Sequence, residues 1–134
     1  MNNLKFRAWD KKLKLLRNVS YIDFESKKMI YRNGFVSYYV NFEDVVIMQS
    51  TGLKDKNGKE IFEGDILKTR TRGFVFVKRQ DGNSTVKYQS GINTTTIVTL
   101  SHFMDNYKVV IAGNIYENKE LIEDEKNWTW KLFR

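Results

Sequence analysis

The sequence predicts an all-β protein, built as a barrel or a sandwich. Short apolar runs rich in valine, isoleucine, threonine and aromatic residues recur about every 8–12 residues, and glycine, asparagine and aspartate separate them. No stretch shows the 3.6-residue apolar periodicity that a long amphipathic helix requires. Evenly spaced short strands of this kind are typical of barrels and sandwiches.

Residues 1–48 are predicted to form an N-terminal β-meander. Apolar and polar side chains alternate over residues 4–9, which is the period-2 pattern of a half-buried strand. A turn at residues 10–12 precedes a return strand over residues 12–15. Asn33-Gly34 favours a type I′ turn, because both central residues of that turn need positive φ. The remaining strands of this part are expected at residues 19–24, 29–31, 35–40 and 45–49.

The densest turn chemistry lies at residues 51–68. Asn57-Gly58 predicts another type I′ hairpin, and Glu63-Gly64-Asp65 predicts a second turn. In that second turn glycine allows a tight bend, and the aspartate side chain accepts hydrogen bonds from nearby backbone amides. This Gly-Asp-apolar entry into a strand is SH3-like. We therefore expect an SH3-like small barrel over residues 49–122, after the N-terminal β-meander subdomain.

The rest of the barrel is also predicted to be mainly strand. A single helical turn is expected at residues 101–105, with Ser101 as its N-cap. The further strands of the barrel are expected at residues 65–70, 74–79, 85–89, 94–100 and 108–112.

Residues 123–134 form a C-terminal aromatic tail beyond the barrel. Trp128, Trp130 and Leu132 share one face at a period of two residues. Exposed apolar side chains of this size are costly, and tryptophan is enriched in binding hot spots. The tail either folds back as an edge strand or adds a strand to a neighbouring protein. The predicted oligomer or partner interface consists of Trp128, Trp130, Leu132 and Phe133.

The composition excludes several kinds of site. Cysteine is absent, which excludes disulfides, thiolate metal centres and cysteine nucleophiles. No apolar run approaches the ~18 residues of a membrane span, and the N-terminus shows no signal peptide. We therefore expect a soluble, cytoplasmic protein that does not associate with membranes.

The chain is basic, with 23 lysine and arginine residues against 16 aspartate and glutamate residues and a net charge of +7. A basic surplus favours nucleic acid or an acidic partner, but a net charge of about 2–8 is ordinary for a small domain. The candidate nucleic-acid contacts surround one predicted hairpin and are Lys68, Arg70, Arg72, Lys78 and Arg79. A second basic group is expected to be a solvated hairpin edge and consists of Lys11, Lys12, Lys14 and Arg17.

Phe74 and Phe76 lie between the candidate nucleic-acid contacts. Aromatic side chains in such a position either stack on bases or pack into a buried strand. The packing interpretation is favoured, because Val75 and Val77 alternate with the phenylalanines as in a strand buried on both faces.

The sequence shows no constellation of catalytic residues. His102 is the single histidine, and a general base needs a positioned partner, so we expect a structural role. A calcium loop counted from Asp55 fails at its sixth and twelfth positions, where Glu60 and Ile66 replace glycine and glutamate. We therefore expect a non-enzymatic protein with no catalytic residues, no metal site and no cofactor.

Three blocks of the sequence resemble the YopX family of phage and prophage proteins from low-GC Gram-positive bacteria. They are FRAWD and KLKL within residues 6–15, MQSTGLKDKNGKEIFEGDI at residues 48–66, and VIAGNIYEN at residues 110–118. The chain departs from the family pattern at residues 118–121, where a proline commonly follows the asparagine. The resemblance implies a β-rich fold with an SH3-like barrel, a phage origin and self-association, and it implies no established activity.

Taken together, these observations predict a phage or prophage accessory protein of the bacterial cytoplasm. We expect it to self-associate as a homo-oligomer and to bind a host or phage protein. The alternative is a protein that binds DNA or RNA through the basic hairpin patch. Steep salt dependence of binding would mark the alternative, because phosphate contacts release counterions.

Overall fold

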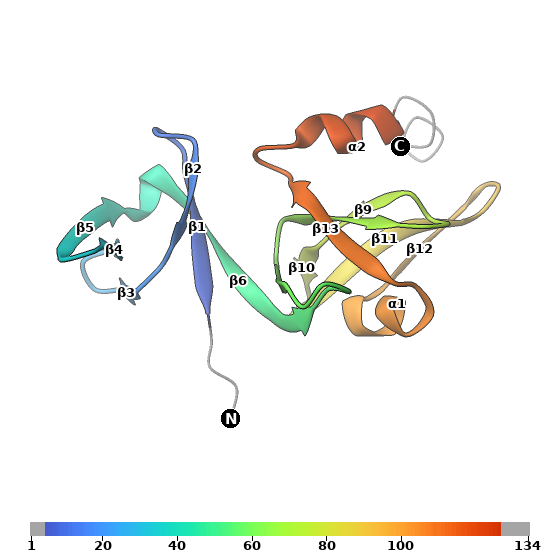
Figure 1. The fold of residues 1–134 in the computed structure, drawn as a ribbon, viewed down its shortest axis with the longest axis horizontal. Coiled ribbons are helices and arrows are strands. Elements are labelled where there is room, and N and C mark those ends of the chain that lie inside the picture. Colours follow the sequence, from blue (N-terminus) through green and yellow to red (C-terminus); the bar gives the residue numbers. More distant parts are fainter. Residues whose placement is uncertain (1–4, 127–134) are drawn as a thin grey trace. The chain divides into compact units, whose positions relative to one another are not determined.

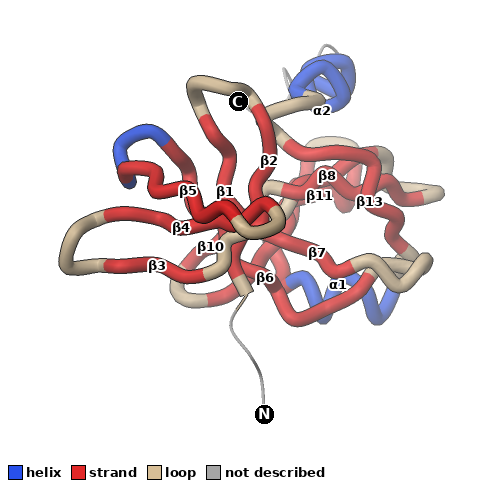
Figure 2. The backbone as a smooth tube through the Cα atoms, turned by 60° about the vertical axis from the view of Figure 1, so that its left-hand side comes forward, coloured by secondary structure: helices blue, strands red, loops and turns tan. Residues whose placement is uncertain are grey.

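The computed structural model describes residues 5–126, and strands make up most of them (Figure 2). The all-β prediction is confirmed. Contacts divide the chain into two compact units, with the division between Ser50 and Thr51. We call the residues up to Ser50 the N-terminal unit and the residues from Thr51 the C-terminal unit.

The N-terminal unit contains two antiparallel sheets. In one sheet β1 lies between β2 and β6, and in the other β4 lies between β3 and β5 (Figure 1). Ala8, Met29, Tyr31 and Val45 form the buried core of this unit. The strands are β1 (Phe6–Asp10), β2 (Leu15–Asn18), β3 (Tyr21–Asp23), β4 (Lys28–Asn33), β5 (Val36–Asn41) and β6 (Val45–Lys54), with a 3-10 helix at Phe42–Asp44.

The first turn is longer than the sequence predicts. The return strand β2 begins at Leu15, and residues 11–14 form the turn. The Asp10 carboxylate accepts hydrogen bonds from the backbone N–H groups of Lys12 and Leu13, at 3.0 and 2.9 Å. These bonds keep Lys12 and Leu13 in the turn, although the alternation pattern assigns both residues to the strand.

The C-terminal unit curls into a half-barrel around one core (Figure 1). Its sheets have the orders β13-β8-β9 and β10-β11-β12, and β7 pairs with the end of β6. The core consists of Ile61, Leu67, Val75, Val77, Val86, Leu100, Phe103 and Val109. The elements are β7 (Glu60–Phe62), β8 (Asp65–Thr69), β9 (Phe74–Phe76), β10 (Lys78–Gln80), β11 (Asn83–Gly91), β12 (Thr94–Thr99), α1 (Leu100–Asn106), β13 (Val109–Asn114) and α2 (Lys119–Lys126).

The hairpin at Asn57-Gly58 forms, but the predicted type I′ geometry is wrong. Gly58 has φ +82°, whereas Asn57 does not have positive φ. The Gly58 N–H donates to the Asp55 carbonyl at 3.0 Å, and the Asp55 N–H donates to the Lys59 carbonyl at 2.8 Å. This is a type I turn followed by a left-handed glycine, a common three-residue hairpin loop.

The prediction of a type I′ turn at Asn33-Gly34 is also wrong. Asn33 belongs to β4, and the loop is Gly34-Phe35 with positive φ at Gly34 alone. Positive φ at the first central position alone is the type II′ pattern. Two successive positive φ values do occur at Asp81-Gly82, which connects β10 to β11.

The predicted turn at Glu63-Gly64-Asp65 is confirmed. Gly64 has φ +87°, and the Asp65 Oδ2 atom accepts a hydrogen bond from the Phe62 N–H at 2.8 Å. The Gly64 N–H also donates to the Val77 carbonyl, and the Gly64 carbonyl accepts from the Ile115 N–H. The turn therefore ties the start of β8 to two distant segments of the barrel.

The C-terminal unit also contains two helices. α1 is longer than the predicted single turn, and its N-cap is Thr99 rather than Ser101, because the Thr99 Oγ1 atom accepts from the His102 N–H at 3.3 Å. α2 is not predicted by the sequence analysis, and it packs against β9. Asn118 directly precedes α2 and is a residue type favoured at helix starts, which is a sequence signal for this helix.

Candidate interaction surface

The outer face of the β3-β4-β5 sheet carries an aromatic row. Tyr21, Ile30 and Tyr39 lie opposite one another on the three strands. Ile30 is 2% exposed, while Tyr21 and Tyr39 on either side of it are 51% and 63% exposed. The row therefore consists of two exposed tyrosines on either side of a buried isoleucine.

Exposed apolar side chains are concentrated in the N-terminal unit. There they are Leu13, Leu15, Tyr21, Phe24, Phe35, Val36, Tyr38 and Tyr39. In the C-terminal unit Ile92 and Ile97 are exposed in the same way. Single exposed apolar residues are normal on a soluble protein, whereas a cluster marks an interaction surface.

A tyrosine stack lies on the inner face of the same sheet, and we define it as Arg17, Tyr31 and Tyr38. The Tyr31 and Tyr38 ring centroids are 4.9 Å apart with an interplanar angle of 13°. The Arg17 guanidinium lies 4.6 Å from the centroid of the Tyr31 ring. The prediction that Arg17 belongs to a solvated edge is therefore wrong, because a cation over an aromatic ring is stabilised by the ring face.

Arg72, one of the candidate nucleic-acid contacts, is held by protein groups. Its Nε atom donates to the Tyr107 hydroxyl at 3.0 Å, and its Nη1 atom donates to the Gln89 carbonyl at 3.1 Å. The guanidinium also lies 5.6 and 5.4 Å from the ring centroids of Tyr88 and Tyr107. These contacts give Arg72 a role in packing the barrel.

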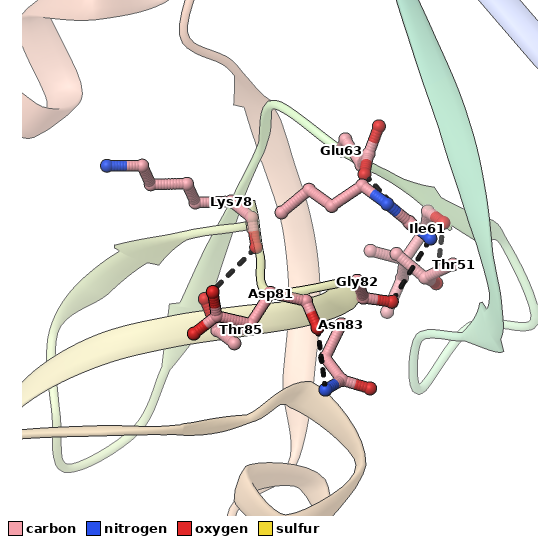
Figure 3. A network of polar contacts seen from close by, with 9 residues as sticks. Thr51, Ile61, Glu63, Lys78, Asp81, Gly82, Asn83 and Thr85 are labelled. Carbon is pink, nitrogen blue, oxygen red and sulfur yellow. Dashed lines mark hydrogen bonds and ion pairs between the residues drawn. The ribbon is translucent and has the colours of Figure 1, made fainter.

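Arg79 is also engaged with protein groups. Its Nη1 atom forms an ion pair with Glu63 Oε2 at 3.1 Å, and its Nη2 atom donates to the Gly82 carbonyl at 3.1 Å. Nearby, the Thr85 hydroxyl donates to the Lys78 carbonyl at 3.1 Å (Figure 3). The β10-β11 hairpin is thereby tied to the turn that precedes β8.

The other three candidate nucleic-acid contacts have exposed side chains. Lys68 lies on β8, Arg70 directly follows the last residue of β8, and Lys78 begins β10. Of the five basic residues named from the sequence, these three are the ones that the structure leaves exposed without a described ion pair.

The two phenylalanines between these residues pack as a strand. Phe74 and Phe76 are half-buried, whereas Val75 and Val77 are buried in the barrel core. α2 packs against the same strand, β9. These observations support the packing interpretation over base stacking.

The Asp55 carboxylate joins the hairpin to β13. Its Oδ1 atom accepts from the N–H groups of Asn57 and Lys59, and its Oδ2 atom accepts from the Ile111 N–H, each at 2.9 Å. Burial raises the pKa of Asp55, but the three hydrogen bonds lower this pKa more, so it lies below the ordinary value. A carboxylate occupied by backbone amides serves as a structural anchor.

Side chains that bind metals do not converge within the described residues. His102 is exposed on α1, and among residues 5–126 no three His, Asp or Glu side chains are placed to hold a metal ion. Within the same range, no helix combines the length and the apolar character needed to cross a bilayer. The predicted tail interface lies outside the described residues and consists of Trp128, Trp130, Leu132 and Phe133.

Comparison with known proteins covers both units. No curated protein matches the sequence. The crystal structure of protein EF1440 from Enterococcus faecalis is similar, with a TM-score of 0.62 and 31% identity over 91% of this chain and 99% of that chain. A family model described as YopX protein matches residues 5–123, a range that includes all three sequence blocks. The chain therefore belongs to the YopX family.

Proposed function

We propose that this protein is a phage or prophage accessory protein of the bacterial cytoplasm and works as a self-associating, non-enzymatic protein-interaction module. The observation that carries the proposal is the aromatic row of Tyr21, Ile30 and Tyr39, in the unit where the exposed apolar side chains are concentrated. The chain self-associates through the sheet that carries this row, and the resulting oligomer binds a host or phage protein. Membership of the YopX family supports the phage origin.

The aromatic row has the composition of an interface centre. Tyrosine is enriched in protein interfaces and among the residues that carry most of the binding energy. Tyr21 and Tyr39 are exposed on either side of buried Ile30, so each tyrosine offers apolar surface to a partner. Burial of that surface is favourable by about 25 cal/mol per Å² of apolar area.

Self-association should weaken when the aromatic row is made polar. The substitution Tyr39→Ser is expected to raise the dimer dissociation constant about 30-fold or more, because a truncated hot-spot residue costs about 2 kcal/mol or more. Sedimentation equilibrium over a range of protein concentrations measures this constant.

Ile97→Ser is the matched control. Ile97 is 53% exposed on β12 of the C-terminal unit, so this variant loses an exposed apolar side chain away from the aromatic row. We expect the control to leave the dissociation constant unchanged. A wild-type protein that stays monomeric at high concentration would overturn the proposal, and an equal loss in the control would move the interface to the barrel.

Nucleic-acid binding is the second candidate function. The exposed side chains of Lys68, Arg70 and Lys78 favour it, because lysine and arginine neutralise phosphates. This candidate ranks second because Arg72 and Arg79 are engaged with protein groups.

Arg70→Ala tests this candidate. Fluorescence anisotropy of labelled single- and double-stranded DNA, repeated at several salt concentrations, gives the dependence of log K on log salt. If Arg70 contacts a phosphate, the substitution should reduce the slope by about 0.7–0.9. Lys27→Ala, at an exposed lysine of the N-terminal unit, should leave the slope unchanged. The absence of binding at low salt would eliminate this candidate.

A further inference from the structure

We infer that β5 pairs antiparallel with β5 of a second copy about a two-fold axis at Tyr38, which joins two β3-β4-β5 sheets into one six-stranded sheet. The inference rests on the proposed self-association. It adds the strand that pairs, the register of the pairing and the side-chain contact at its centre.

β5 is an open edge strand. It is the last strand of the sheet β3-β4-β5, and most of its residues are exposed. It contains neither proline nor a charged residue, which are the residues that natural edge strands use to block pairing. An open edge of this kind is suited to the addition of a strand.

The hydrogen-bond pattern shows which residues of β5 face outward. The Phe42 N–H donates to the Lys27 carbonyl at 3.0 Å, so these opposing residues form a hydrogen-bonded pair. Hydrogen-bonded and non-hydrogen-bonded pairs alternate along an antiparallel ladder, so every second residue before Phe42 also bonds to β4. Tyr38, four residues before Phe42, is one of these residues. The backbone groups of Ser37 and Tyr39 therefore point away from β4, toward the open edge.

This alternation limits the registers of a symmetric pairing. The residues that face outward are odd-numbered, and each new hydrogen-bonded pair joins two of them. The residue numbers of two paired residues therefore add up to an even number. The two-fold axis lies at half of this sum, so it passes through a residue of β5 and not between two residues. With the axis at residue 37, 38 or 39, the residue opposite Tyr38 is Val36, Tyr38 or Val40 of the second copy.

The tyrosine stack selects the axis at Tyr38. The Tyr31 and Tyr38 rings are 4.9 Å apart, which matches the spacing of about 4.7–4.9 Å between neighbouring strands. A side chain opposite Tyr38 on an added strand takes the next position in this stack. Of the three registers, only the one centred on Tyr38 places an aromatic ring there. On the outer face, Tyr39 then lies opposite the small Ser37 of the second copy.

A second copy also fits the charge of this edge. Residues 33–42 contain no lysine, arginine, aspartate or glutamate. A polyanion such as a nucleic acid would therefore meet no cation along this strand. Two copies of the chain, each with a net charge of +7, can pair here without contact between like charges.

Ser37→Pro tests the edge. Proline removes the outward N–H of Ser37, which forms no bond within the sheet, so the protomer should keep its fold. Ser37→Ala is the matched control, because it keeps this N–H. We expect Ser37→Pro to raise the dimer dissociation constant at least tenfold and Ser37→Ala to leave it nearly unchanged. Sedimentation equilibrium measures the constant, and circular dichroism checks the fold of both variants.

Single cysteines test the register in a chain that has no cysteine of its own. Two Tyr38 residues facing each other form a non-hydrogen-bonded pair with Cα atoms about 4.5 Å apart, within the range of a disulfide. The two Tyr39 residues are then about 8–9 Å apart, beyond that range. Tyr38→Cys should therefore yield a disulfide-linked dimer under mild oxidation, and Tyr39→Cys should not.

The outcomes separate this inference from the proposed function. A wild-type monomer overturns both. A dimer that a folded Ser37→Pro variant does not weaken overturns pairing through β5 and leaves self-association standing. Cross-linking of Tyr39→Cys without cross-linking of Tyr38→Cys overturns the register centred on Tyr38.

Discussion

Replacing Asp55 with alanine is expected to lower the free energy of unfolding of the C-terminal unit by about 3–4 kcal/mol. Asp55 is 6% exposed, and its carboxylate accepts three backbone hydrogen bonds. Asn57 and Lys59 lie at an exposed hairpin tip, where water replaces the lost bonds in part. The Ile111 N–H on β13 loses a hydrogen bond to a charged group, and such bonds contribute about 1.5–3 kcal/mol.

Urea unfolding followed by circular dichroism measures the effect. Asp105→Ala is the control, because Asp105 is an exposed carboxylate on α1, and it should change stability by less than about 0.5 kcal/mol. Asp55→Asn keeps the shape of the side chain but offers a single acceptor oxygen, so an intermediate loss is expected. Equal midpoints for Asp55→Ala and Asp105→Ala would show that the carboxylate does not anchor the hairpin.

The pKa of Asp55 sets the direction of the pH dependence. Burial raises this pKa, but the hydrogen bonds from Ile111, Lys59 and Asn57 lower it by more, so it lies below the ordinary value of 3.8. A carboxyl with a depressed folded-state pKa stabilises the protein above its unfolded-state pKa, and this stabilisation is lost as the pH falls through the folded-state pKa. The stability difference between wild type and Asp55→Ala should therefore be constant near neutral pH and shrink below about pH 4.

The strands and the Gly-Asp turn are predictable from the sequence because both depend on near neighbours. Alternation along a strand records which face is buried, and the Asp65 carboxylate bonds to an amide three residues away. The type I′ prediction at Asn57-Gly58 fails for a related reason. The dipeptide pattern omits the side chain of Asp55, which bonds to the Asn57 and Lys59 amides and favours a type I turn.

The roles of the arginines and of the interaction surface depend on residues far along the chain. Arg17 lies over Tyr31 and Arg72 bonds to Tyr107, and nothing in the local sequence separates these side chains from solvated cations. The aromatic row likewise requires the registers of two strand pairs, which place Tyr21 and Tyr39 on either side of Ile30. α2 packs against β9, which precedes it by more than forty residues, so tertiary contact rather than periodicity supports this helix.

Replacing Gly113 with alanine is expected to destabilise the C-terminal unit by about 2–4 kcal/mol. A Cβ atom at Gly113 would lie 2.9 Å from the Asn118 Cβ atom and closer still to its carboxamide group. Asn118 must then move, and its Oδ1 atom leaves the Asn114 N–H, from which it accepts a hydrogen bond at 3.1 Å. Asn114 is 4% exposed, so water does not readily replace this bond.

A glycine control and a double-mutant cycle identify the cause. At Gly91 an added Cβ atom meets Thr94 at 3.5 Å, an ordinary contact, so Gly91→Ala should change stability by less than about 1 kcal/mol. Asn118→Gly removes the whole side chain that clashes, including its Cβ atom, so on that background Gly113→Ala should cost less than about 1 kcal/mol in urea unfolding. Equal costs on both backgrounds would rule out the clash. Neither Gly113 nor Gly91 has positive φ, so the need for glycine at position 113 comes from its contact with Asn118 rather than from its backbone conformation.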